Sequence, residues 1–294
     1  MIVTLTNHTL TAQIDSIGAQ LISLRNASGT EYIWQRDPAH WKSCSPLLFP
    51  TVGNCRDGKY TLNGQTYRIP KHGFCRNADF AVFVLSDQEA SFTLTDSPET
   101  RASYPFAFQL KLTYTLAEDG IQILYTVTNP GTEPMYYQLG THPGFNCPLQ
   151  SGEQFEDYVL EFEQDETSGY HSYDLNRMEF DMNSYTPILE HASVIPLTHE
   201  LFANDAIFFT DLRSKKVALK NPSTGYGVEV SYQDFATVAF WTAAATKAPF
   251  LCVEAWNGSA IRSDEDDNFL NRHFLQEVDG GESKTYRLGI RIVS

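Results

Sequence analysis

The sequence lacks the cysteine pattern of a disulfide scaffold or a zinc knuckle. It holds five cysteines, and none of them stand in a C-x-x-C spacing: Cys44, Cys55, Cys75, Cys147 and Cys252. An odd number of cysteines without that spacing argues against a disulfide framework and against a cysteine-bound zinc ion. We therefore expect neither.

Long apolar runs and an excess of positive charge are also missing. No stretch approaches the roughly 18 apolar residues of a membrane span. The start of the chain, Met1 to Asn7, has no basic region followed by an apolar run, so no signal peptide is expected. The formal net charge of -15 repels phosphate backbones. We expect a cytoplasmic protein that binds neither membranes nor nucleic acid.

Helical periodicity is absent, whereas two-residue alternation recurs along the chain. Apolar residues occupy every second position at 108–116 and at 121–127, on either side of an Asp119-Gly120 turn. That alternation is typical of antiparallel strands with one buried face. Asn63-Gly64 predicts a type I′ turn in a hairpin over 60–67. The acidic stretch 151–186 is predicted to form loops, and 198–203 a short helix. The sequence favours one all-β domain over 1–294, a sandwich of antiparallel sheets.

Three segments each place one titratable side chain in an apolar setting punctuated by glycine or aromatic residues. His72 lies in Lys71-His72-Gly73-Phe74-Cys75-Arg76, His142 in Gly140-Thr141-His142-Pro143-Gly144-Phe145-Asn146, and Glu254 in Phe250-Leu251-Cys252-Val253-Glu254-Ala255-Trp256. Partial burial raises the pKa of a glutamate towards a range useful for a general base. The alternatives are two structural histidines in tight turns and a glutamate that faces water at a sheet edge.

Carboxylates near aromatic rings suggest a polyhydroxylated ligand. Asp205 interrupts an apolar run, and its simpler role is to cap a turn. Trp241, Trp256, Phe74 and Phe145 are candidates to stack on the C–H face of a sugar, or else belong to the core. No G-x-S-x-G elbow, P-loop or dinucleotide fingerprint is present. The two histidines and the glutamate lack the compact spacing of many metal motifs, so we expect no metal site.

Together these segments resemble the aldose 1-epimerase (galactose mutarotase-like) family, and within it the LacX-type branch. The resemblance runs along nearly the whole chain. The motifs that carry it are His72-Gly73-Phe74 with Arg76, His142-Pro143-Gly144-Phe145, Glu254 with Trp256, Pro46-Leu47-Leu48-Phe49-Pro50 with Gly53, Asp57-Gly58-Lys59-Tyr60, and Asn204-Asp205-Ala206.

The resemblance implies a β-supersandwich of twisted antiparallel sheets with the site in an open cleft. It implies that His142 is the general acid, which gives a proton to the ring oxygen of a cyclic hexose. Glu254 would be the general base that takes the proton of the anomeric hydroxyl. His72 would bind near the ring oxygen, and Asp205 would bind sugar hydroxyls. Arg76, Phe74, Trp241 and Trp256 join them as substrate-binding candidates. Neither a metal nor a cofactor is required.

The sequence departs from the family pattern at one position. Mutarotases carry an arginine where this chain has Asn54, and Arg56, two residues later, is our candidate to take its place. Two alternatives to a mutarotase of free hexoses remain. One is a hexose-6-phosphate 1-epimerase, for which Lys71, Arg56 and Arg76 are available to bind phosphate. The other is a non-catalytic sugar-binding or sensing protein. Either a monomer or a homodimer is compatible with the sequence.

Overall fold

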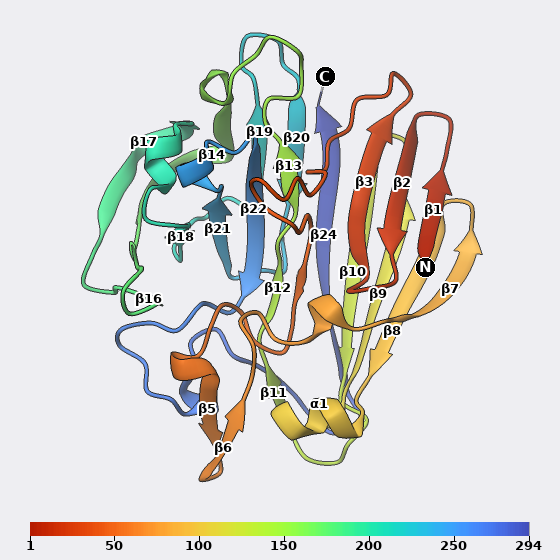
Figure 1. Cartoon of the computed structure of the whole chain (residues 1–294), viewed down its shortest axis with the longest axis vertical. Coiled ribbons are helices and arrows are strands. Elements are labelled where there is room, and N and C mark those ends of the chain that lie inside the picture. The colour runs from red at the N-terminus through yellow and green to blue at the C-terminus, as the bar shows by residue number, and fades with distance from the viewer. Residues whose placement is uncertain (294) are drawn as a thin grey trace.

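The computed structural model describes residues 1–293, and strands dominate it. The largest sheet has nine strands (Figure 1). Their order is β17 (Thr186–Pro196), β14 (Val159–Tyr170), β19 (Lys216–Lys220), β20 (Gly227–Ser231), β24 (Ser283–Val293), β10 (Gly120–Thr128), β9 (Gln109–Leu116), β8 (Glu89–Thr95) and β7 (Ala81–Ser86).

Two smaller sheets lie over the nine-stranded sheet (Figure 1). The six-stranded sheet carries the candidate site. Its order is β18 (Ile207–Phe209), β21 (Thr237–Trp241), β22 (Phe250–Asn257), β12 (Leu139–Thr141) and β4 (Leu47–Leu48), and β13 (Gly144–Asn146) also pairs with β22. The three-stranded sheet is β1 (Ile2–Thr6), β2 (Leu10–Asp15) and β3 (Gln20–Asn26).

Three two-stranded ribbons and several short helices complete the fold. The ribbons are β5 (Lys59–Leu62) with β6 (Gln65–Arg68), β11 (Met135–Tyr137) with β23 (Gln276–Val278), and β15 (Tyr173–Asp174) with β16 (Glu179–Phe180). The α-helix is α1 (Pro98–Ser103), and the 3-10 helices are η1 (Arg56–Gly58), η2 (Cys75–Asn77), η3 (Phe155–Asp157), η4 (His199–Phe202), η5 (Ala244–Thr246) and η6 (Phe269–Asn271). No helix within residues 1–293 has the length and apolar character needed to cross a membrane.

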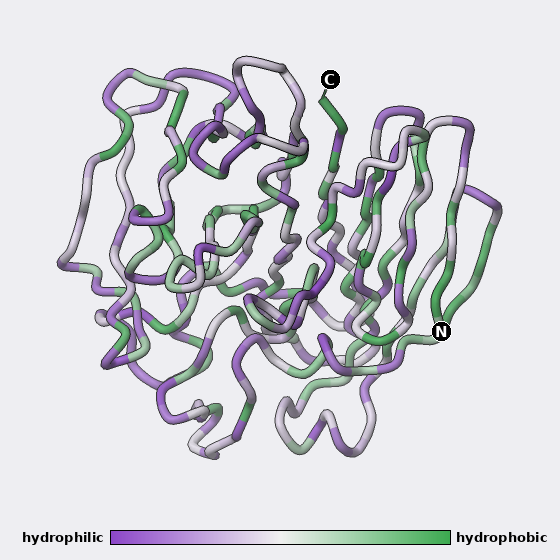
Figure 2. The backbone as a smooth tube through the Cα atoms, turned by 45° about the horizontal axis from the view of Figure 1, so that its top comes forward, coloured by the Kyte–Doolittle hydropathy of each residue, from purple (hydrophilic) through white to green (hydrophobic). Residues whose placement is uncertain are grey.

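Side chains on the buried faces of the strands pack the sheets against one another. On β9 the residues are alternately buried and accessible, and Figure 2 shows short hydrophobic and hydrophilic stretches following one another along the chain. The Tyr114 hydroxyl on β9 donates to the carbonyl oxygen of Ala19, 2.6 Å away, which joins the nine-stranded sheet to the segment before β3. Phe162 on β14 meets Phe240 on β21 with ring centroids 6.0 Å apart. The site-bearing sheet is thus packed directly on the large sheet.

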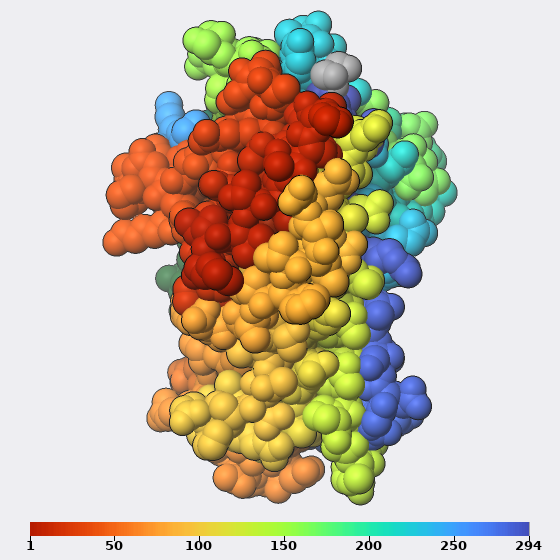
Figure 3. Space-filling model, turned by 90° about the vertical axis from the view of Figure 1, so that its right-hand side faces the viewer, coloured from red at the N-terminus to blue at the C-terminus, as the bar shows by residue number. Residues whose placement is uncertain are grey.

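The N-terminal strands close one side of the molecule. Figure 3 shows the red N-terminal strands beside the orange segment that contains β7 and β8. The amide N–H of Thr6 donates to the carbonyl of Asp87 in the turn between β7 and β8. Because β1 reaches this turn, the three-stranded sheet covers the end of the nine-stranded sheet.

Most of the predicted strands and the predicted hairpin are confirmed. Asn63 and Gly64 have φ of 51° and 78°, the two positive values that a type I′ turn needs. The predicted helix at 198–203 is confirmed as the 3-10 helix η4. All five cysteines are free thiols.

The prediction of loops over 151–186 is wrong. This stretch contains the 12 residues of β14, one of the longest strands, and the ribbon β15–β16. Its many acidic residues hid the alternation because several face solvent or pair with neighbouring strands, as Glu161 does with Lys220.

Candidate active site

The strand β22 forms the floor of the candidate site. It lies between β21 and β12, and all eight of its residues are buried. Side chains two apart on a strand point to the same face, so Cys252, Glu254 and Trp256 share one side of β22. Glu254 therefore lies at the centre of a sheet with 2 % of its surface exposed, and the alternative of a sheet-edge glutamate facing water is excluded.

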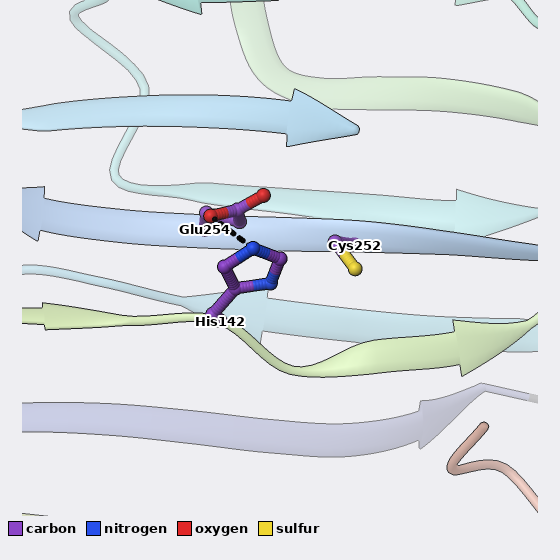
Figure 4. Close-up of side chains that lie close together, drawn as sticks. All are labelled: His142, Cys252 and Glu254. Atoms are coloured by element: carbon purple, nitrogen blue, oxygen red, sulfur yellow. Dashed lines mark ion pairs between the residues drawn. The ribbon is translucent and has the colours of Figure 1, made fainter. Parts of the chain in front are cut away.

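The register of the sheet brings His142 opposite Glu254. Gly140 on β12 pairs with Trp256, and Gly144 on β13 pairs with Cys252. Continuing the antiparallel register between these two pairs sets position 142 across from position 254. His142 occupies the break between β12 and β13, and its Nε2 lies 3.1 Å from the Glu254 carboxylate (Figure 4). Two segments that are 112 positions apart thus form one acid–base pair by strand pairing.

A tight turn presents His72 to the same site. The backbone of His72 is left-handed, with φ of 68°, and Gly73 follows with φ of 71°. A Cβ on Gly73 would lie 2.0 Å from the carbonyl oxygen of Phe49, so only glycine fits there. The amide N–H of Gly53 donates to Nδ1 of His72 at 3.1 Å. Because Nδ1 accepts, the neutral ring carries its proton on Nε2 and can donate from that atom.

These side chains meet at a cavity of about 300 Å³. The volume falls at the lower end of the range for small-molecule sites, about 300–1,000 Å³. The indole ring of Trp41 stacks on the His142 imidazole with centroids 5.0 Å apart, and Trp241 meets the same ring edge-on at 5.8 Å. Among the 15 lining residues are eight that the sequence offered as catalytic or binding candidates: Lys71, His72, Arg76, His142, Asp205, Trp241, Glu254 and Trp256.

Burial makes the His142–Glu254 pair neutral. It lowers the pKa of His142 to about 3, and the positive charges of Lys71 and Arg76 act in the same direction. Burial also raises the pKa of Glu254 well above its usual range, and the Asp205 carboxylate adds to this effect. Both shifts arise because a charged group is expensive to remove from water. The free protein therefore favours a neutral imidazole at His142 and the protonated form of the Glu254 carboxyl group.

Several buried polar atoms around the cavity have no partner within residues 1–293. They include Nδ1 of His142 and Nε1 of Trp256. Trp256 lines the cavity and lies two positions after Glu254 on the same face of β22. Unpaired buried donors cost stability, and a ligand that offers hydroxyl oxygens would satisfy the indole N–H.

Four of the sequence candidates lie outside the lining of the cavity: Arg56, Asn54, Phe74 and Phe145. Arg56 instead contacts Glu179 at 3.1 Å and Asp267 at 3.2 Å, and it donates to two backbone carbonyls. These partners hold the guanidinium of Arg56 outside the lining of the cavity. Phe74 packs against Phe108 with centroids 5.9 Å apart and belongs to the core.

Asn54, the departure from the family pattern, contacts the site indirectly. Its side-chain amide donates to the carbonyl of Met178 at 2.6 Å and accepts from the Tyr173 hydroxyl at 3.0 Å. Tyr173 lines the cavity. Asn54 therefore holds an aromatic wall in place where the family pattern has a cation.

The sequence did not point to several residues that line the cavity. Trp41 lies in a loop with no strand pattern, and Tyr173 and Phe180 lie in the acidic stretch that was predicted to be loops. An aromatic residue in an otherwise polar segment was the one available signal for Tyr173 and Phe180.

One group of side chains has the composition of a metal site. The donor atoms of His142, Cys252 and Glu254 all lie within 4.8 Å of one another (Figure 4). Zinc accepts this set of ligand types. Burial raises the pKa of the Cys252 thiol well above its usual range, so a metal there must first displace a proton from a buried thiol and another from the carboxyl group.

The antiparallel sandwich is a galactose mutarotase-like fold, as its similarity to solved structures shows. The model of the aldose 1-epimerase family matches residues 1–268. The chromosomal protein LacX of Lactococcus lactis subsp. lactis is 34% identical over 271 residues, which cover 90% of this chain and 90% of LacX.

Solved structures agree with this match. The galactose mutarotase related enzyme from Lactobacillus acidophilus superposes with a TM-score of 0.94 at 30% identity, covering 100% of this chain and 98% of that one. A galactose mutarotase-like protein from Lactobacillus casei superposes with a TM-score of 0.89 at 29% identity, over 99% and 100% of the two chains. The chain belongs to the aldose 1-epimerase family. Membership makes it an isomerase and supports a sugar epimerase or mutarotase role.

Proposed function

We propose that this protein is an aldose 1-epimerase that interconverts the α and β anomers of a hexose. The observation that carries the proposal is the contact of 3.1 Å between His142 Nε2 and the Glu254 carboxylate at the floor of the cavity. The ring oxygen and the anomeric hydroxyl of an aldose are bonded to the same carbon. An acid and a base that act on both atoms must therefore lie close together, as these two do.

The proposed roles follow from which atoms are available. His142 gives a proton to the ring oxygen while Glu254 takes the proton of the anomeric hydroxyl, and the ring opens to the free aldehyde. Rotation about the first carbon–carbon bond and reclosure give the other anomer. His72 donates from Nε2 near the ring oxygen, and Asp205 accepts from sugar hydroxyls. General acid–base catalysis of this kind contributes about 10²–10⁴-fold.

The protonation state of the free protein is compatible with these roles. A neutral imidazole beside a protonated carboxyl group carries the same number of protons as an imidazolium beside a carboxylate. Moving one proton from Glu254 to His142 therefore prepares the pair without exchange with solvent. Sugar hydroxyls that donate to the carboxylate favour the charged form, because hydrogen bonds to an ionised group stabilise it.

The walls of the cavity suit a sugar. Trp41 and Trp241 present flat apolar surfaces beside His142, and the Trp256 indole offers an unpaired N–H. The proposed steps are proton transfers together with the breaking and re-forming of one carbon–oxygen bond, and no atom changes its net oxidation state, so we propose that the reaction needs neither a metal nor a cofactor.

Polarimetry tests the proposal. Freshly dissolved α-D-glucose and α-D-galactose relax to their equilibrium rotation, and the protein should accelerate the decay of at least one of them or of its 6-phosphate. Failure to accelerate any of them, while a hexose still protects the protein against thermal unfolding, would overturn the catalytic proposal and leave a sugar-binding protein.

A further inference from the structure

Positive side chains collect around the cavity of this acidic protein. Lys71 and Arg76 line the cavity itself. An adjoining hollow of about 510 Å³ shares Trp41 and Arg76 with the cavity and is lined in addition by Arg36 and Lys42. Two separate segments, 36–42 and 71–76, thus bring four cationic side chains to one place.

None of these four cations is neutralised by the described part of the chain. Within residues 1–293, most lysines and arginines form ion pairs, such as Arg56 with Glu179 and Lys220 with Glu161. Within that range the side chains of Arg36, Lys42, Lys71 and Arg76 form no ion pair or hydrogen bond; the one side-chain contact to Arg76, from Gln20, is to its backbone carbonyl. Besides Glu254 of the acid–base pair, two carboxylates lie nearby, and none of the three forms an ion pair with either segment. Asp205 lines the cavity, and Asp15, which lines the hollow, is 3.9 Å from the N-terminal amine.

Arg76 is the most informative of the four. It lies at the junction, because it lines both the cavity and the hollow, and its side chain is half-buried. An arginine remains charged, has five N–H donors and is costly to bury without partners. A guanidinium in that position, with its donors free, is arranged to bind an anion, because a planar fork matches phosphate or carboxylate oxygens.

We infer that the hexose taken by this site carries an anionic group of the phosphate class, bound by Arg76 and Lys71 at the junction with the basic hollow. This inference rests on the proposed function and specifies its substrate. The phosphate cannot be on the anomeric oxygen, because that hydroxyl must lose its proton for the ring to open. A phosphate on the primary hydroxyl, as in a hexose 6-phosphate, leaves the reacting atoms free.

The charge of the ligand also affects the acid–base pair. Burial is the main cause that lowers the pKa of His142, and the charges of Lys71 and Arg76 add to it. An anion bound between these two cations offsets their effect and favours the protonated form of His142, which is the form that donates. Lys71 also lowers the pKa of Glu254, so the same anion favours the protonated carboxyl group, and its effects on the acid and on the base oppose each other.

The test compares neutral and phosphorylated sugars in the full-length protein. Anomer exchange is measured by NMR for glucose and galactose and for their 6-phosphates, with the wild type, Arg76→Gln, Lys71→Met and the exposed control Lys284→Met. We expect kcat/KM to be at least about tenfold higher for a 6-phosphate than for its parent sugar. Arg76→Gln should lower it by about 10- to 100-fold for the phosphate, as expected for a lost charged hydrogen bond, and by a smaller factor for the neutral sugar.

The outcomes separate this inference from the proposed function. If the protein exchanges neutral sugars without preferring the 6-phosphates, and neither Arg76→Gln nor Lys71→Met acts selectively on the 6-phosphates, the inference of an anionic substrate is overturned. The proposal of an epimerase then still stands. If inorganic phosphate inhibits the exchange of neutral sugars but the 6-phosphates are not preferred as substrates, the anion binds as a separate ligand. That result also overturns the inference of an anionic substrate. No exchange of any of the four sugars overturns the epimerase itself. Thermal melts show whether each variant is folded. If Arg76→Gln does not fold, Lys71→Met alone decides the test.

Discussion

Replacing His142 by asparagine tests whether the imidazole is neutral in the folded protein. The pKa of His142 in the folded protein is about 3, whereas the ordinary pKa of a histidine is 6.5. Below pH 6.5 the unfolded chain therefore binds a proton at this position and the folded chain does not. Stability contributed by neutral His142 is fully present above pH 6.5 and is lost as the pH falls towards 3.

The size of the effect follows from the pKa difference. Each pH unit in this window changes the free energy of unfolding by about 1.4 kcal/mol. From pH 6.5 to pH 5, wild type should lose about 2 kcal/mol relative to His142→Asn, and near pH 3 the total approaches about 5 kcal/mol. The raised pKa of Glu254 affects the pH dependence of stability in wild type and in His142→Asn alike, because its main cause is burial. This contribution therefore cancels when the free energies of unfolding of the two proteins are subtracted.

Urea denaturation at pH 6.5 and pH 5 measures the difference, with tryptophan fluorescence as the probe. Trp41 and Trp241 both contact the His142 ring. His8→Asn is the matched control, since His8 is exposed in the folded protein as well as in the unfolded chain. If the gap between wild type and His142→Asn is the same at both pH values, the imidazole is not neutral and the free protein holds a charged pair instead.

Three further predictions concern the base, the turn and metals. Glu254→Gln keeps the shape of the side chain but cannot accept a proton, so anomer exchange should fall by about 10²–10⁴-fold while the melting temperature stays near that of wild type; unchanged exchange would rule out Glu254 as the base. Gly73→Ala should lower the urea midpoint much more than Gly64→Ala, because a Cβ at Gly73 meets Phe49 at 2.0 Å and a Cβ at Gly64 meets nothing within 4 Å; equal losses would contradict the close approach. Dialysis against EDTA should leave anomer exchange unchanged, and a loss restored by Zn²⁺ would show that the donor atoms around the pair hold a metal.

Sequence patterns predicted the parts of the fold that depend on local chemistry. The two-residue alternation that gives β9 and β10 is visible because one face of each strand is buried, and the Asn63-Gly64 turn follows from the backbone freedom of those two residues. The strand β14 escaped prediction because several of its acidic residues face solvent or are paired with neighbouring segments, and those pairs exist only after folding.

The candidate site was predictable to a similar extent. His142 and Glu254 stood out because each is a titratable residue in an apolar segment, but their contact depends on the register between β22 and the strands β12 and β13. Arg56 was a reasonable substitute for a cation at position 54, since residues two apart in an extended segment point the same way. The backbone turns into the 3-10 helix η1 at Arg56, and the guanidinium pairs with Glu179 instead.

A double-mutant cycle on the acid–base pair tests the central claim most directly. Anomer exchange is measured by NMR for wild type, His142→Asn, Glu254→Gln and the double variant, on whichever sugar the wild type turns over. Residues that act as one unit are not additive, so the double variant should be no slower than the slower single variant, with both singles about 10²–10⁴-fold below wild type. Losses that multiply in the double variant, or wild-type exchange in either single variant, would contradict catalysis by the His142–Glu254 pair.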